Sequence, residues 1–187
     1  VPSESLLPYV EQSLAQCEIP ARYGPGRPIA RTSPYRLLAA TADYLETRSF
    51  WALAALLRHT AVGDWLVSQQ VRGDWLTEAD EYQAAHLPAS ADGSWCGSAK
   101  SYAALKDAYA ALSALIESSF GRLAPGAVRP LSGWGQPILD YLTAIFGVRI
   151  LERDREPGRT HWLACKAARD ALASHAALNR LGSLQPP

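Results

Sequence analysis

The chain has no methionine among its 187 residues and only three cysteines (Cys17, Cys96 and Cys165), which lie far apart and form no CxxC pair. An odd number of widely spaced cysteines is a poor framework for disulfide bonds and favours a reducing compartment. Because a translated chain normally begins with methionine, the opening Val1-Pro2-Ser3 indicates a processed chain or an excised domain, and we predict excision from a larger protein. The opening residues do not show the basic-then-apolar pattern of a signal peptide, and no apolar run approaches roughly 20 residues, so we expect a cytoplasmic location and no membrane partner.

The motifs of nucleotide binding and hydrolysis are missing as well. The sequence contains no GxxxxGK[ST] phosphate loop, no GxSxG, no HExxH and no GxGxxG. The segment Gly133-Trp134-Gly135 has two glycines of the last motif but lacks the third, and it is predicted to be a loop that leads into a helix. We therefore expect no catalytic centre and no cofactor in this segment.

Two sets of reactive residues match the motifs of known sites only weakly. His161 and Cys165 are four residues apart, so on a helix both would face one metal ion. Further ligands would have to come from His86, Cys96 or Cys17, and none of these has a recognised spacing. Cys96 also lacks the neighbouring base and cationic environment that a thiol nucleophile needs. We predict no metal site and no catalytic cysteine.

Apolar residues recur at helical spacing along most of the chain, and they make up enough of it, 48% with 19% charged, for a folded core. No strand-like alternation and no repeat is found. The clearest stripe has a period of 3.5 residues: Tyr102, Leu105, Tyr109, Leu112, Ile116 and Ser119. We predict an all-α fold, an irregular bundle of about eight helices without a substantial sheet, as a single domain over residues 1–187.

Capping signals predict where several helices begin. Serine or threonine residues, in two cases with proline or acids after them, mark starts at Thr32-Ser33-Pro34, Thr60, Thr77 and Thr160. The first of these helices is expected to bury a stripe made of Tyr35, Leu38, Ala42 and Leu45.

Charge is balanced overall but uneven along the chain. The 18 basic and 18 acidic side chains cancel, which excludes a whole-surface attraction to nucleic acid but not a local patch. From Arg22 to Arg58 six arginines face two acids, a net charge of +4, whereas Asp64 to Asp92 has six acids and one arginine, a net charge of −5. Guanidinium forks suit phosphate oxygens. We predict DNA-phosphate contacts from Arg22, Arg27, Arg31 and Arg36; alternatively, the arginines pair with the acidic stretch inside the fold.

Three segments resemble a known family. They are "VPSESLLPYVEQSLAQCEIPARYGPGRPIARTSPYRLL" at the start, "SFWALAALLRHTAVGDWL" at Ser49–Leu66 and "ADEYQAAHLP" at Ala79–Pro88. These are similar to the stretch that follows helicase motif IV in AddB/RecB-type subunits, superfamily-one helicases fused to a PD-(D/E)XK nuclease, as in AddAB and RecBCD. The matching part of that family is a helical insertion, the accessory domain called 2B.

The resemblance implies a non-catalytic accessory domain of a DNA helicase or nuclease in recombinational repair. Its partners would be duplex DNA or a duplex–single-strand junction, and the rest of the parent chain or a partner helicase subunit. The ATP site, helicase core and nuclease would lie outside this segment. Two other hypotheses remain. One is a protein-interaction module whose six tryptophans form a docking face. The other is a small-molecule-binding helical protein, which would need a deep pocket with converging polar groups.

Overall fold

The computed structural model describes residues 6–19, 28–98, 101–121, 131–147 and 158–178. Within these ranges the chain is helical and forms no strand, apart from one isolated antiparallel bridge between Ser49 and Ser90. The predicted all-α class with about eight helices is confirmed. The α-helices are α1 (Leu7–Gln16), α2 (Ser33–Thr47), α3 (Phe50–Leu57), α4 (Thr60–Ser68), α5 (Trp75–His86), α6 (Ala103–Phe120), α7 (Gly135–Phe146) and α8 (Gly158–Leu178). Two 3-10 helices are η2 (Ile29–Arg31) and η3 (Leu131–Trp134).

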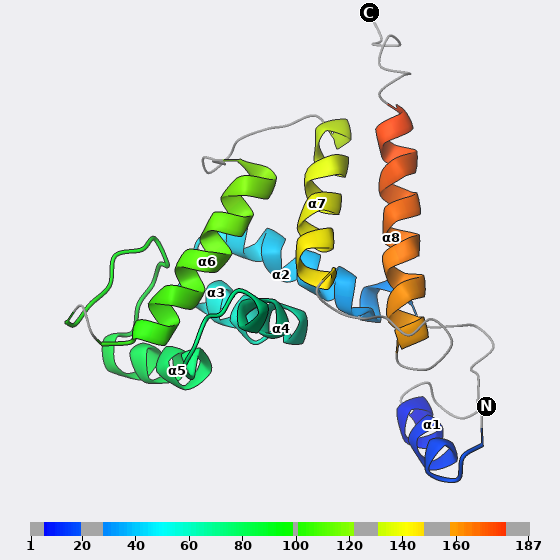
Figure 1. Cartoon of the computed structure of the whole chain (residues 1–187), viewed down its shortest axis with the longest axis horizontal. Coiled ribbons are helices and arrows are strands. Elements are labelled where there is room, and N and C mark those ends of the chain that lie inside the picture. The colour runs from blue at the N-terminus through cyan, green and yellow to red at the C-terminus, as the bar shows by residue number, and fades with distance from the viewer. Residues whose placement is uncertain (1–5, 20–27, 99–100, 122–130, 148–157, 179–187) are drawn as a thin grey trace, which may run out of the picture.

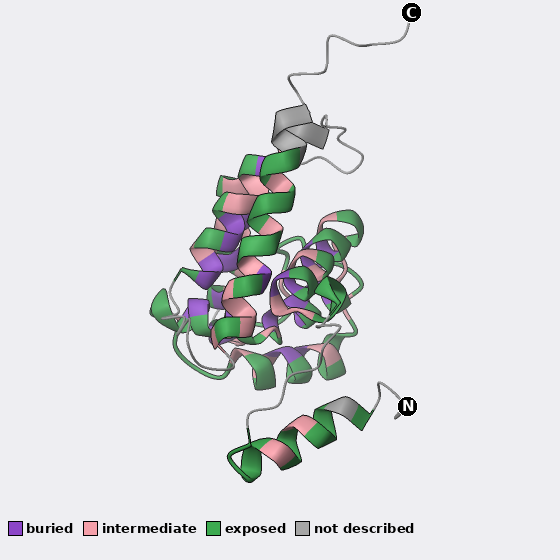
Figure 2. Ribbon diagram, turned by 90° about the vertical axis from the view of Figure 1, so that its right-hand side faces the viewer, coloured by how far each residue is buried: buried purple, intermediate pink, exposed green. Residues whose placement is uncertain are grey.

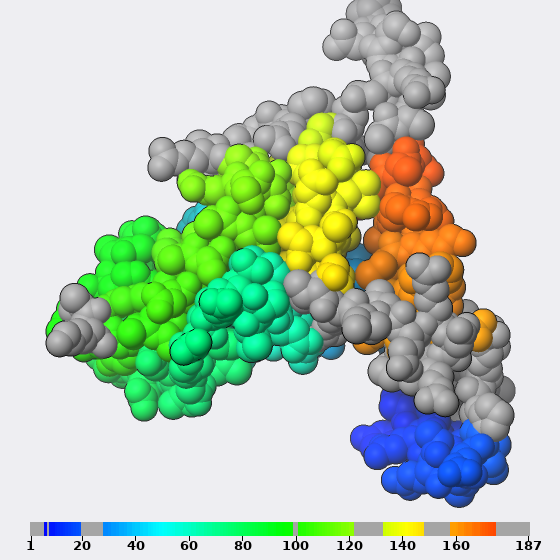
Figure 3. Space-filling model, in the orientation of Figure 1, coloured from blue at the N-terminus to red at the C-terminus, as the bar shows by residue number. Residues whose placement is uncertain are grey.

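The helices pack in an irregular bundle. Helices α6, α7 and α8 stand in a row across α2, while α3, α4 and α5 cluster below α6 and α7 in this view (Figure 1). Buried residues lie on the sides where these helices meet one another (Figure 2). Helix α1 projects from the packed body (Figure 3), and none of its described side chains is buried. In the part of the chain that the structure describes, no helix is long and apolar enough to cross a membrane.

Helix α3 is the most apolar element of the bundle. Its sequence, FWALAALL, leaves no polar side, and a helix that is apolar all round has to be surrounded by other elements. Six of its eight residues are buried, and α2, α4 and α5 pack around it. Ser49 begins the helix by accepting a hydrogen bond from the Ala52 N–H at 3.1 Å, while Trp51 remains 70% exposed.

The buried stripe of α2 differs from the predicted one. Of the predicted residues, Tyr35 and Ala42 are exposed, while Leu38 and Leu45 are only partly buried. The helix instead buries Pro34, Leu37, Thr41 and Tyr44, which follow the same spacing on a neighbouring side of the helix. The prediction was wrong because it assigned a threonine to the solvent side.

The Thr41 side chain can be buried because its hydroxyl makes two hydrogen bonds. It donates to the Leu37 carbonyl oxygen at 2.8 Å, so its one proton is used there, and the Tyr141 hydroxyl of α7 must donate to the Thr41 oxygen at 3.0 Å. Burial raises the pKa of Tyr141 to about 12, so the phenol keeps its proton at neutral pH. The bond from Tyr141 to Thr41 joins α7 to α2 across the core.

Several predicted helix starts shift by a few residues. Helix α4 is capped by His59, one residue before the predicted Thr60. Helix α5 begins at Trp75 rather than Thr77 and is capped by Asp74, whose carboxylate accepts from the Thr77 N–H and hydroxyl. These two bonds hold the pKa of Asp74 below its usual value. Helix α8 begins at Gly158, so Thr160 lies inside its first turn.

An aromatic cluster holds the loop between α5 and α6. The Tyr82 ring packs against Phe50, Trp95 and Tyr102 with centroid distances between 5.1 and 5.4 Å. Its hydroxyl accepts a hydrogen bond from the Cys96 N–H at 3.0 Å. Aromatic pairs at these distances stabilise beyond the area they bury. The tryptophan beside Cys96 therefore has a packing role, and the cysteine itself is exposed.

The hydrogen bond between the Thr41 and Tyr141 hydroxyls predicts that two conservative substitutions lower the free energy of unfolding by different amounts. Thr41→Val leaves the Tyr141 hydroxyl buried without an acceptor and should lower the free energy of unfolding by about 2 kcal/mol. Tyr141→Phe leaves Thr41 still bonded to Leu37 and should cost about 1 kcal/mol or less. Urea denaturation of both variants measures this. Equal costs, or a larger cost for Tyr141→Phe, would contradict the assigned direction of the bond.

Candidate anion-binding site

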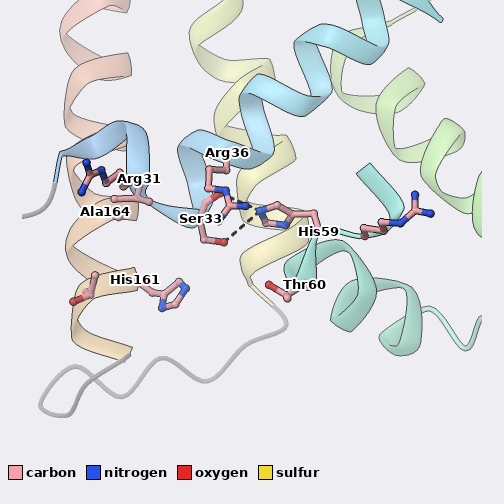
Figure 4. Close-up of a pocket in the computed structure, with 10 residues that line it drawn as sticks. Arg31, Ser33, Arg36, His59, Thr60, His161 and Ala164 are labelled. Atoms are coloured by element: carbon pink, nitrogen blue, oxygen red, sulfur yellow. Dashed lines mark hydrogen bonds between the residues drawn. The ribbon is translucent and has the colours of Figure 1, made fainter. Parts of the chain in front are cut away.

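A cavity of about 270 Å³ opens where the first turns of α2, α4 and α8 meet (Figure 4). Its described wall carries three arginines, two histidines and four hydroxyl side chains, and none of these wall residues is acidic. The lining residues are Arg31, Thr32, Ser33, Arg36, Arg58, His59, Thr60, Thr160, His161 and Ala164. The composition of this wall favours a negatively charged ligand.

Three helix starts contribute to the same wall. Ser33 is the first residue of α2 and Thr60 the first of α4, while Thr160 and His161 belong to the first turn of α8. The first N–H groups of a helix have no partner within that helix, and each start carries about half a positive charge. Helix starts are for this reason common positions for phosphate and other anions.

His59 joins the starts of α2 and α4. Its Nδ1 accepts a hydrogen bond from the Ala61 N–H at 3.3 Å, and its Nε2 lies 3.2 Å from the Ser33 carbonyl oxygen. A backbone N–H can only donate and a carbonyl oxygen can only accept, so Nδ1 is unprotonated and Nε2 carries the proton. The neutral imidazole thus caps α4 and ties it to the first residue of α2.

The arginines take different positions around the cavity. Arg36 is one turn into α2, and its side chain reaches toward Ser33 and His59, whereas Arg31 lies on the side of α8 (Figure 4). Arg31 is placed by the η2 turn, which Thr32 closes with a hydroxyl bond of 2.6 Å to the Ile29 carbonyl oxygen. Both arginines are exposed at the surface.

Arg58, the third arginine of the wall, forms an ion pair through its guanidinium with Asp80 of α5. This contact joins the basic stretch of the sequence to the acidic one. Such pairing within the fold was the alternative to phosphate contact for the six arginines. For Arg58 the pairing is observed. Its charge is therefore partly offset by a carboxylate, and less of it is available to a ligand.

The structure brings together two of the four arginines predicted to contact phosphate. Arg31 and Arg36 both line the cavity, while Arg22 and Arg27 lie outside the described residues. Seven other polar wall residues were not predicted as contacts: Thr32, Ser33, Arg58, His59, Thr60, Thr160 and His161. Thr32-Ser33, Thr60 and Thr160 had been recognised as helix starts, which is the one signal that pointed toward an anion site.

The residues considered for metal binding lie in different surroundings. His161 lines the cavity, whereas Cys165 is partly buried and packs against the core, where burial raises the pKa of its thiol. Cys17 and Cys96 are exposed. Across the described ranges, no three side chains of the metal-binding types gather in one place.

Comparison with models of known protein families, with curated proteins and with solved structures finds no match to this chain. Its function is therefore inferred from its own residues. The features that carry the inference are the all-α fold and the basic cavity where three helices begin.

The capping role of His59 predicts how its variants behave. His59→Ala removes the acceptor for the Ala61 N–H and should lower the free energy of unfolding by about 1 kcal/mol. His59→Asn supplies a side-chain oxygen that suits the same position, so it should retain most of that stability. Thermal unfolding followed by circular dichroism compares the two. If both variants melt together, well below the wild type, the cap is not what His59 contributes.

Proposed function

We propose that this chain is a non-catalytic helical domain that binds nucleic acid through its phosphate groups at the basic cavity. One observation carries the proposal: Arg31 and Arg36, predicted from sequence to contact phosphate, line a cavity with two histidines, four hydroxyls and three helix starts. Guanidinium, hydroxyl and backbone N–H groups are the donors that proteins use on phosphate oxygens.

The hydrogen-bond donors of the wall indicate which part of a nucleic acid the domain would recognise. Contacts to phosphate fix the register and orientation of a nucleic acid but carry no sequence information. The wall offers hydrogen-bond donors on arginines, on short side chains and at helix starts, all of which suit phosphate oxygens. The domain would therefore position DNA irrespective of its sequence.

The larger setting follows from the resemblance to AddB/RecB-type subunits. In such a protein the domain would hold a duplex, or a duplex–single-strand junction, in place for a helicase or nuclease elsewhere in the assembly. The packed helices supply a rigid support, since α2, which positions Arg36, is itself fixed by α3 and α7. Rigid placement is what a positioning domain has to provide.

The geometry of His59 supports a binding role rather than a catalytic one. Both of its ring nitrogens are used inside the fold, Nδ1 toward Ala61 and Nε2 toward Ser33. A general base needs a ring nitrogen within reach of a substrate proton. His59 is thus committed to structure.

Binding of a tailed duplex by the full chain, followed by fluorescence anisotropy over a salt series, tests the proposal. Affinity should fall steeply as salt rises, because bound phosphates release their counterions. Arg36→Ala and Arg31→Ala should each weaken binding to all sequences alike and reduce the slope of log affinity against log salt by about 1.

The matched control is Arg72→Ala, which removes the same charge from an exposed site that is not part of the cavity wall. It should leave the affinity close to that of the wild type. Absence of binding at low salt would overturn the proposal, as would an Arg72→Ala effect as large as that of Arg36→Ala.

A further inference from the structure

We infer that Tyr35 stacks on an unpaired base of a strand whose phosphate lies in the cavity, so that the domain prefers single-stranded nucleic acid to a blunt duplex. The inference rests on the proposed function and makes it more specific. It names the kind of strand that the site takes and a side chain that holds a base without reading its identity. It follows from the exposure of Tyr35 and from its position on α2.

Tyr35 is an aromatic residue that the core leaves outside. Its spacing in the sequence predicted a buried position, yet its side chain is 48% exposed, because α2 buries Pro34, Leu37 and Thr41 instead. Within the described residues, its hydroxyl makes no hydrogen bond and its ring contacts no other ring. Tyrosine has a large aromatic surface and only two side-chain torsions to fix, so it is well suited to bind a flat group.

Tyr35 lies at the edge of the cavity. It belongs to the first turn of α2 and is not itself part of the cavity wall, but its neighbours in the chain are: Arg31, Thr32, Ser33 and Arg36. Successive residues of a helix point about 100° apart, so Tyr35 is next to Arg36 on the side of α2 that faces away from the core. Long side chains on a helix lean toward its N-terminal end, which is the end of α2 that borders the cavity (Figure 4).

This arrangement suits one nucleotide of an unpaired strand. Arg36 offers a guanidinium to the phosphate, and Tyr35 offers a ring to the base that a single sugar joins to that phosphate. In a duplex each base is paired and covered on both faces by its neighbours, so a ring beside a phosphate donor meets only the backbone. In a single strand the bases can turn outward and stack on an aromatic side chain.

The acidic residues of α2 limit the size of the site. Asp43 and Glu46 are exposed on the same helix, more than two turns beyond Tyr35. Their carboxylates would repel a strand that ran along α2. The strand is therefore expected to cross the start of α2, and to place one base on Tyr35 rather than a run of bases along the helix.

The test compares a labelled thymine single strand with a labelled blunt hairpin duplex that has the same number of phosphates. The full chain should bind the single strand more tightly. Tyr35→Leu keeps an apolar side chain and removes the ring, so it should weaken single-strand binding by about 10-fold, the effect of one stacked base. It should leave the duplex affinity close to that of the wild type, and Tyr35→Phe, which keeps the ring, should retain the single-strand affinity.

A salt series separates stacking from charge. The ring of Tyr35 carries no charge, so Tyr35→Leu should lower single-strand affinity without changing the slope of log affinity against log salt. Arg36→Ala should instead reduce that slope by about 0.7. A strand with the same phosphates but with abasic sites in place of its bases should bind the wild type about as weakly as the thymine strand binds Tyr35→Leu.

The matched control is Trp51→Leu, which removes an aromatic ring that is 70% exposed on α3 and is not part of the cavity wall. It should preserve the preference for the single strand. A loss of single-strand affinity as large as that of Tyr35→Leu would show a general effect of surface aromatics and would overturn the inference. Circular dichroism should show wild-type helix content in both variants, since both side chains lie outside the core.

The remaining outcomes distinguish the two proposals. If the single strand and the duplex bind equally, or if Tyr35→Leu weakens both alike or neither, the inference falls. The proposed function still stands in that case, provided that Arg36→Ala weakens binding. If neither nucleic acid binds at low salt, both proposals fall.

Discussion

Because the sequence of α3 is apolar on every side, this helix has to be enclosed, and its enclosure determines where the neighbouring helices run. The chain turns into α3 directly after α2, at Arg48 and Ser49, and turns out of it at Arg58 and His59. It thereby returns to the beginning of α2, where His59 meets Ser33. The α2 and α4 sides of the cavity are therefore a consequence of burying one hydrophobic helix.

Bringing three helix starts together has an electrostatic cost, since each start is positive and two arginines lie beside them. Part of that cost is offset inside the fold: neutral His59 caps α4, and Arg58 pairs with Asp80. The described wall also contains Arg31 and Arg36, and none of its described residues is acidic. Sequences depart from locally favourable arrangements chiefly at functional sites, and a bound anion would turn this unfavourable convergence into a favourable one.

Helix content was predictable from sequence because apolar spacing and breaks such as Thr47–Ser49 are local signals. The buried side of α2 was not. Two stripes of equal spacing compete there, and hydrophobicity alone prefers the one without Thr41. The structure prefers the other because Tyr141, a hundred positions away, satisfies the Thr41 hydroxyl. Which polar group can be buried depends on a partner that the local sequence does not contain.

The cavity, too, depends both on local sequence and on contacts between residues far apart in the chain. A count of charges along the chain identified a basic stretch and treated its arginines alike, yet the fold separates them. Arg36 stands one turn inside α2 and reaches into the wall, whereas Arg58, just before α4, pairs with Asp80 on α5. Thr160 and His161 join the wall from α8, about a hundred residues further along the chain than Thr60. Local sequence therefore supplies the donors, and the packing of α2, α4 and α8 decides which of them meet.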